Sequence, residues 1–257
     1  MPVNTNLNPC YLDYYNKTAT GILTINSFNE ENSEKFHQLI DSLFTRIRTS
    51  NLKNLIIDLR RNEGGAEGYE DYVFSYLTSQ PYRKYKYVEA SGFSYSFLQN
   101  TNYASPERQL ELEKELREEH YLESDGRIYR KKGILTPETP KVNSFKGNIY
   151  VITSGLTYSG GAEFVSLIKG HRKATFIGRE VGGGYYGNTS GFSIKLTLPN
   201  SKISVRIPLL KFVVDVKGNI PFGHGVIPDY PLDPTIDEYL KGYDTELEFA
   251  KKMTKKK

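Results

Sequence analysis

The chain has 257 residues, 38% of them hydrophobic and 25% charged, which excludes collagen-like, low-complexity and fully disordered proteins and allows a large core. No apolar run approaches the roughly 18 residues of a membrane-spanning helix, and a single cysteine, Cys10, excludes an internal disulfide and a zinc cluster. The net charge of +4 includes five lysines among the last seven residues, so the rest is nearly neutral and predicts no nucleic-acid partner.

The first part of the chain predicts a strand, a helix and a second strand. Residues 1–20 are polar and tyrosine-rich without clear periodicity, and we expect an N-terminal extension there. GILTINSF (21–28) predicts a strand, and apolar residues at helical spacing follow across about 32–49. NLIIDLR (54–60) is a near-continuous apolar run, typical of a strand covered on both faces. This order indicates a βαβ crossover within a largely parallel or mixed sheet, and hence an α/β protein.

The middle of the chain is less regular. Residues 80–145 hold a tyrosine-rich extended piece and a charged helix, PERQLELEKELREEH (106–120), whose apolar stripe is narrow. We expect this region to be a lid-like insertion packed on the core and not a separate domain. The core domain is then predicted over 21–253, followed by a basic tail at 254–257.

Regular patterns resume in the second half. NIYVITS (148–154) predicts another buried strand, which turns into a helix running to residue 170, and ATFIG (174–178) predicts a further strand. A glycine-rich loop occupies 179–191. Two strand-like runs across 192–210, separated by the turn residues Asn200 and Ser201, predict a hairpin.

Ser159 stands where the predicted strand 148–154 turns into its helix. Three small residues follow it, Gly160, Gly161 and Ala162, so a substrate carbonyl could reach the hydroxyl. The helix N-terminus offers unpaired N–H groups and a partial positive charge to a developing oxyanion. The pattern therefore suits a nucleophilic serine, although on spacing alone a helix cap is the commoner interpretation.

Gly64 and Gly65 follow the buried strand 54–60. Paired glycines in such a turn can direct their N–H groups at an anion, but an ordinary strand-ending turn explains them equally well. The run Gly182–Gly184 is too loose for a dinucleotide fingerprint, and no phosphate-binding loop pattern occurs.

Among the four histidines, His224 is the candidate for a general base. It lies between Gly223 and Gly225 in a loop, where the backbone could bring it close to a site, although a structural role is also open. His37, His120 and His171 are predicted to be surface residues. No two histidines have metal-ligand spacing, so we expect no metal site, and no pattern calls for a cofactor.

Five stretches in chain order resemble the tail-specific, or C-terminal-processing, serine peptidase family, which includes the tricorn core peptidases and the interphotoreceptor retinoid-binding protein repeats. They are LIIDLRRNEGG (55–65), YVITSGLTYSGGAEF (150–164), ATFIGREVGGGYYG (174–187), GHGVIPDY (223–230) and LKGYDTELEFA (240–250). Each is weak alone, but five with compatible spacing make a specific signal. The resemblance covers roughly residues 20–253.

The resemblance implies a crotonase-like core of repeated ββα units and peptide-bond hydrolysis through a serine acyl-enzyme, on a peptide or protein substrate. Ser159 matches the nucleophile, and Gly160 with Gly64 or Gly65 matches the oxyanion hole. Family members are usually exported to the periplasm or cell envelope, whereas the start of this chain, MPVNTNLNPC, shows no signal-peptide pattern.

The chain departs from the family at the general base. Many members carry a lysine after the serine helix, but none occurs between Lys173 and Lys195. The tricorn branch uses a histidine in the first strand, where this chain has Thr24. We therefore favour a serine endopeptidase acting on extended or C-terminal peptide segments, with Ser159 as nucleophile and His224 as a substitute base. The alternative is a catalytically lapsed module that binds a peptide or an apolar ligand.

Overall fold

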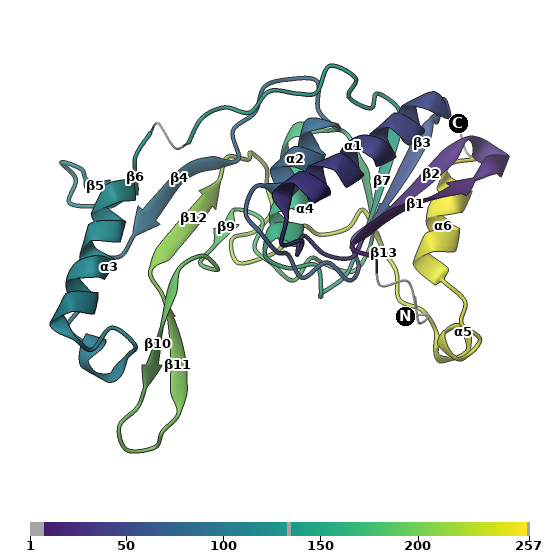
Figure 1. Cartoon of the computed structure of the whole chain (residues 1–257). Coiled ribbons are helices and arrows are strands. Elements are labelled where there is room, and N and C mark those ends of the chain that lie inside the picture. Colours follow the sequence, from purple (N-terminus) through teal and green to yellow (C-terminus); the bar gives the residue numbers. More distant parts are fainter. Residues whose placement is uncertain (1–7, 133–134, 256–257) are drawn as a thin grey trace. The chain divides into compact units, whose positions relative to one another are not determined.

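The computed structural model describes residues 8–132 and 135–255, which form two compact units (Figure 1). The core unit consists of the chain up to residue 82, residues 138–186 and the chain from residue 216 onward. The second unit consists of residues 83–137 and 187–215.

The core unit is built on a six-stranded mixed sheet, which confirms the predicted mixed α/β fold. Its strand order is β1 (Cys10–Tyr15), β2 (Thr20–Ile25), β3 (Asn54–Asp58), β7 (Asn148–Thr153), β8 (Thr175–Gly178) and β13 (Tyr230–Pro231). β1 pairs antiparallel with β2, and all the other pairings are parallel. Residues 10–15, which the sequence analysis assigns to an N-terminal extension, thus form the edge strand. The sequence analysis does not predict a strand there because only Cys10 and Leu12 among these residues are buried, so the apolar pattern is too short.

Helices cover both faces of this sheet. α1 (Ser33–Thr49), α2 (Tyr69–Ser75) and α4 (Gly160–His171) lie on one side, and α6 (Thr245–Met253), which follows the short α5 (Ile236–Leu240), lies on the other (Figure 1). α1 begins where predicted, because the Asn32 side chain accepts the Lys35 N–H at 3.0 Å. Ile22 and Ile56 pack with Ala250 in the cluster that attaches α6.

The second unit contains a five-stranded antiparallel sheet, a separate two-stranded hairpin and one long helix. The sheet order is β5 (His120–Leu122), β6 (Ile128–Arg130), β4 (Tyr85–Ala90), β12 (Leu210–Val214) and β9 (Gly187–Asn188). The predicted hairpin is confirmed as β10 (Ser193–Thr197) and β11 (Ser204–Pro208). Two 3-10 helices complete the assignment, η1 (Asn16–Thr18) in the core unit and η2 (Leu98–Asn100) in the second.

α3 (Pro106–Glu119) has the narrow buried stripe that the sequence predicts, since only Leu112 and Leu116 are buried. His120 at its end is a correction, because the predicted surface residue is buried. Its Nδ1 lies 3.0 Å from the carbonyl oxygen of Leu116, one turn earlier in the last part of α3. None of the helices within the described residues combines the length and the apolar character that crossing a membrane requires.

Candidate active site

Ser159 occupies a strained turn at the start of α4. Its backbone has φ 49° and ψ −126°, a conformation that costs a non-glycine residue about 1–3 kcal/mol. Although Ser159 stands at the N-cap position, its side chain makes no capping hydrogen bond, so the ordinary cap interpretation is wrong. The residue is half-buried. The strained backbone of this turn therefore presents a hydroxyl group that does not cap α4.

The serine turn is attached to the turn that follows β3. Thr157 donates its hydroxyl to the Leu59 carbonyl oxygen at 2.8 Å, and the Tyr158 N–H donates to the Asn62 carbonyl oxygen at 2.9 Å. These bonds join segments almost a hundred residues apart in the chain. They fix the two turns predicted to carry the nucleophile and the paired glycines against each other.

Gly64 lies directly against Ser159. A methyl group on Gly64 would stand 2.6 Å from the Ser159 Cβ, 3.0 Å from its Oγ and 2.8 Å from the Gly160 nitrogen. Gly64 also has φ +100°, which favours glycine, so both the backbone and the space require this residue. The structure thus brings together three of the residues predicted from the sequence, Ser159, Gly64 and Gly160.

The N–H groups of the two glycines that follow Asn62 and Glu63 differ in what they bind. The Gly64 N–H donates to Asn62 Oδ1 at 2.9 Å. Gly65 instead forms a parallel bridge with Phe28, in which its own N–H points away from Phe28. For the N–H groups of Gly65 and Gly160 no acceptor is found among the described residues. Gly65 and Gly160, and not Gly64, therefore have N–H groups available to an oxyanion.

His224 is paired with a carboxylate that the sequence analysis missed. Its Nδ1 lies 3.0 Å from Oε1 of Glu180, and the same oxygen accepts the Gly225 N–H at 3.1 Å. Both side chains are about half exposed. A proton held on Nδ1 by the carboxylate would leave Nε2 as a proton acceptor. The available signal was the acid in the stretch REVGGG, two residues before the first glycine of the run.

The glycine-rich loop 179–191 contacts both the turn that leads to Ser159 and the loop that carries His224. The Gly182 N–H donates to the Thr157 carbonyl oxygen at 3.1 Å, and the Tyr185 N–H donates to the His224 carbonyl oxygen at 2.9 Å. In the described part of the chain the His224 ring bonds to Glu180 and not to Ser159. The structure therefore places the predicted nucleophile and the predicted base on loops that pack against one common loop, without a direct hydrogen bond.

Glu70 adjoins the site, whereas Thr24 lines a cavity whose walls contain none of the predicted site residues. Glu70 in α2 is 1% exposed, and its Oε2 lies 3.7 Å from the point where a side-chain carbon on Gly160 would stand. Thr24, which the sequence analysis expected at the position of the tricorn histidine, is buried on the same face of the sheet as Ile22. There it lines a cavity of about 400 Å³ together with Asp58.

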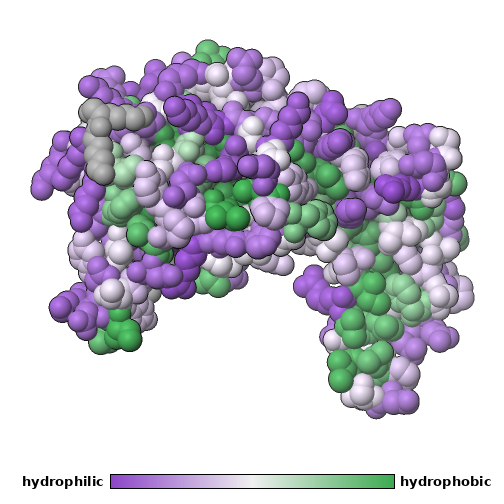
Figure 2. Space-filling model, turned by 180° about the vertical axis from the view of Figure 1, so that it is seen from behind, coloured by the Kyte–Doolittle hydropathy of each residue, from purple (hydrophilic) through white to green (hydrophobic). Residues whose placement is uncertain are grey.

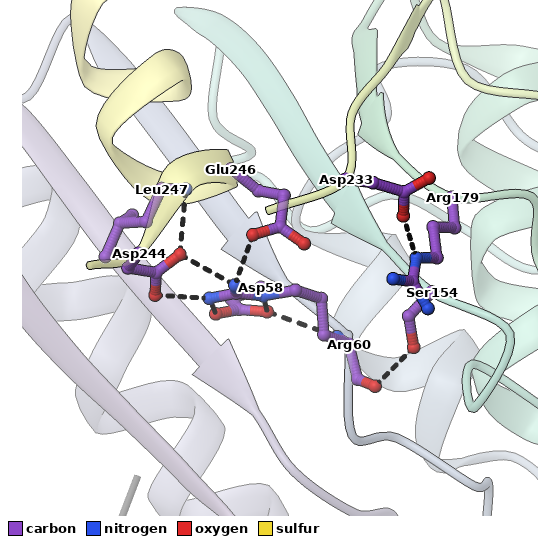
Figure 3. Close-up of polar contacts among 8 residues, drawn as sticks. All are labelled: Asp58, Arg60, Ser154, Arg179, Asp233, Asp244, Glu246 and Leu247. Atoms are coloured by element: carbon purple, nitrogen blue, oxygen red, sulfur yellow. Dashed lines mark hydrogen bonds and ion pairs between the residues drawn. The ribbon is translucent and has the colours of Figure 1, made fainter. Parts of the chain in front are cut away.

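A buried cluster of charged side chains surrounds Arg60, shortly before the turn that carries Gly64 and Gly65 (Figure 3). Arg60, with a side chain only 7% exposed, binds Asp58 at 2.7 Å, Asp244 at 2.7 Å and Glu246 at 3.3 Å. Burial alone would raise the pKa of Asp244, but the hydrogen bond and the charge of Arg60 hold that pKa below its ordinary value. The Ser154 hydroxyl donates to the Arg60 carbonyl oxygen at 2.6 Å, so the cluster links α6 to both turns of the site.

Comparison with known proteins places the chain in a family. The model of Peptidase family S41 matches residues 19–232, a span that includes Ser159, both glycine turns and His224. No curated protein sequence matches the chain. Among solved structures, a candidate peptidase from Parabacteroides merdae is 19% identical with a TM-score of 0.63, over 96% of this chain and 64% of its own.

Two further solved structures share the fold at similarly low sequence identity. Mature CPAF is 21% identical with a TM-score of 0.55, over 92% of this chain and 50% of its own. The photosystem II D1 C-terminal processing protease is 16% identical with a TM-score of 0.51, over 90% of this chain and 50% of its own. The chain thus spans 64% or less of the length of each of these proteins. The resemblance inferred from the five stretches is confirmed, and the chain belongs to peptidase family S41, the family of the tail-specific serine peptidases.

Proposed function

We propose that this protein is a serine endopeptidase that hydrolyses peptide bonds through an acyl-enzyme on Ser159. The observation that supports it most is the strained Ser159 turn, whose hydroxyl does not cap α4 and whose side chain lies against Gly64. Strain of this kind concentrates at functional sites, and here the neighbouring N–H groups of Gly65 and Gly160 supply the complementary donors.

In the proposed first half-reaction, the Ser159 oxygen attacks the substrate carbonyl carbon and its proton passes to His224 Nε2. The carbonyl oxygen becomes an oxyanion that accepts hydrogen bonds from Gly65 and Gly160. Glu180 orients the ring and stabilises the imidazolium through Nδ1. When the C–N bond breaks, the leaving amine takes the proton from Nε2 and the acyl-ester on Ser159 remains.

In the second half-reaction, water attacks the ester and gives its proton to His224 Nε2, and Ser159 leaves with that proton. Both halves require the loop carrying His224 to bring Nε2 within hydrogen-bonding reach of Ser159 once substrate is bound. Catalytic hydrogen bonds are often long before substrate binds, so this requirement is compatible with the pairing of His224 with Glu180 alone.

We infer further that the substrate is an extended or C-terminal peptide segment. The name of the photosystem II D1 C-terminal processing protease describes such a substrate for that relative. The succession β1–β2–α1 in the core unit is also one ββα unit of the kind that the crotonase-like architecture repeats.

A second candidate is a lapsed peptidase module that binds a peptide or an apolar ligand. Thr24 stands at the tricorn histidine position, and residues 174–194 contain no lysine, so both bases of the family are missing. A serine without a base loses orders of magnitude in rate.

A fluorophosphonate probe separates the two candidates. We expect covalent labelling of the wild-type chain, complete loss of labelling in Ser159→Ala, and normal labelling in Ser201→Ala, which changes a serine in the exposed hairpin turn. Labelling of Ser159 together with cleavage of an unstructured protein supports the peptidase. An unlabelled wild-type chain at every pH from mildly acidic to alkaline would contradict the peptidase and favour the lapsed module.

A further inference from the structure

The β10–β11 hairpin has two faces of opposite chemistry. Directly paired residues of an antiparallel pair share a face. One face is entirely apolar, and its pairs are Ile194 with Ile207, Leu196 with Val205, and Leu198 with Ile203. The other face carries Lys195 opposite Arg206 and Thr197 opposite Ser204.

The apolar face continues outward beyond the packed part of the unit. Ile194 at its base is fully buried, whereas Val205 is 40% exposed and Ile203 is 59% exposed. Figure 2 shows hydrophobic surface gathered along this hairpin, which is the arm at the lower right. A row of apolar side chains that becomes solvent-exposed along one face is typical of a surface that contacts another apolar surface.

The outer edge of β11 is open. On the other side of the hairpin, Leu196 of β10 bridges to Thr101, but no described residue pairs with the outer edge of β11. The bond from the Leu198 N–H to the Ile203 carbonyl oxygen, at 2.9 Å, fixes the alternation of the ladder. It follows that Ser204 and Arg206 direct their N–H and C=O groups outward.

The charge of this region has one sign. Residues 187–214 contain no aspartate or glutamate, and their four charged residues are all basic, namely Lys195, Lys202, Arg206 and Lys211. A partner strand beside β11 would therefore meet positive charge on one face of the hairpin and apolar side chains on the other.

We propose that the outer edge of β11 is a docking site for an extended peptide segment in which apolar and acidic residues alternate. The segment adds as a third strand and bonds to the outward groups of Ser204 and Arg206. Its apolar side chains cover Ile203 and Val205, and its acidic side chains meet Arg206 on the opposite face. This site is separate from the chemistry of Ser159.

The chemistry of the hairpin favours a peptide over two other occupants. A membrane-inserting tip needs apolar residues in its turn, but residues 199–202 are Pro, Asn, Ser and Lys. A second copy paired through β11 would bring the Lys202 and Arg206 side chains of the two chains together, and like charges across a pair are unfavourable.

The test uses the full chain carrying Ser159→Ala, so that no peptide is cut. We would measure fluorescence anisotropy with a labelled nine-residue peptide, capped at both ends, that alternates glutamate with valine or threonine. The lysine-for-glutamate peptide is expected to bind at least about tenfold more weakly, and Arg206→Glu is expected to reverse the preference.

A backbone substitution isolates strand addition. Ser204→Pro removes one outward N–H that β10 does not use and should weaken binding about fivefold or more, whereas Ser204→Ala should bind as the parent does. Thermal unfolding confirms that each variant is folded. Equal binding of both peptides, equal binding by Ser204→Pro and its parent, binding to phosphatidylserine vesicles but not to the peptide, or a dimer abolished by Arg206→Glu would each overturn the proposal. Since these readouts do not involve catalysis, the proposal survives or fails independently of the peptidase activity.

Discussion

The core unit and the second unit hold their strands together in different ways. In the core unit the strands from β2 to β13 run parallel, and helices such as α1 and α4 provide the crossovers. In the second unit all described sheet pairings are antiparallel. A parallel sheet gathers the carboxyl ends of distant strands at one edge, which is where α/β proteins place their sites. Every candidate catalytic residue, from Gly64 to His224, accordingly lies in the core unit.

The two units also differ in how their charges are used. The core unit encloses Arg60 among three carboxylates, whereas the second unit relies on exposed pairs such as Arg117 with Glu113 at 2.8 Å. Buried ion clusters are costly to break because the remaining charges stay desolvated, while exposed pairs contribute little. The difference predicts that the buried cluster around Arg60 tolerates substitution much less well than the exposed pair of Arg117 and Glu113.

Removing one arginine from each unit should give the largest contrast. We expect Arg60→Met to lower the free energy of unfolding by about 3–5 kcal/mol, because Asp58, Asp244 and Glu246 would remain buried without their cation. Arg117→Met should lower it by about 0.5 kcal/mol or less. Urea unfolding measures both, and similar losses would contradict the difference between the units.

Adding a methyl group to one glycine of each unit tests where the site lies. Gly64→Ala should reduce kcat/KM by at least about 100-fold, because the methyl group displaces Ser159 or the Gly160 N–H. Gly126→Ala in the second unit has φ +82° and no atom within 4 Å, so it should cost about 1 kcal/mol of stability and leave kcat/KM unchanged. The test is to measure peptide hydrolysis and thermal unfolding for both variants. An active Gly64→Ala enzyme would exclude the proposed geometry of the site.

Replacing one glutamate of each unit tests the partner of His224. Glu180→Gln should lower kcat by about 10- to 100-fold with little change in stability, because the ring loses the carboxylate that orients it through Nδ1. Glu119→Gln, which weakens the partly buried pair with Arg130 in the second unit, serves as the control and should retain full activity. Steady-state kinetics of the two variants gives the comparison, and unchanged kcat in Glu180→Gln would remove Glu180 from the mechanism.

The smallest expected contrast is in the dependence of stability on pH. Burial lowers the pKa of His120 below its ordinary 6.5, so stability should decline as the pH falls below about 6.5, where the unfolded chain takes up the proton first. The pKa of Asp244 is lowered as well, but its contribution to stability is lost only at more acidic pH, as the pH falls below the ordinary value of 3.8. Thermal unfolding should show a loss of a few degrees between pH 7 and pH 5.5 that His120→Gln reduces. If that variant keeps the full pH dependence, His120 is not its source.

The local elements of the core unit were largely predictable. The apolar periodicity of α1 and the continuous apolar run of β3 place these elements within two residues of their observed bounds. Such patterns show which residues face the core, because each turn of a helix, or each second residue of a strand, places a side chain on the buried face. The same reasoning failed at β1, where only two residues are buried, and at His120, which is buried although it directly follows a helix with a narrow apolar stripe.

The candidate site was only partly predictable. Ser159, Gly64, Gly65 and Gly160 carry family motifs, so their roles could be proposed from the resemblance. Glu180 and Glu70 could not, because a carboxylate has no sequence pattern that names its partner. Their relation to His224 and Gly160 depends on loop packing between segments far apart in the chain.

The sequence by itself determined the mixed α/β class, the hairpin at Asn200 and Ser201, and membership of peptidase family S41. These follow from hydrophobic periodicity, turn chemistry and ordered motifs, all of which are local. Only the tertiary structure decided that the Ser159 side chain does not cap its helix, that Gly64 commits its N–H to Asn62 while Gly65 does not, and that Glu180 pairs with His224. Those outcomes depend on distances between residues remote in sequence, which backbone hydrogen bonds and packing establish only once the chain has folded.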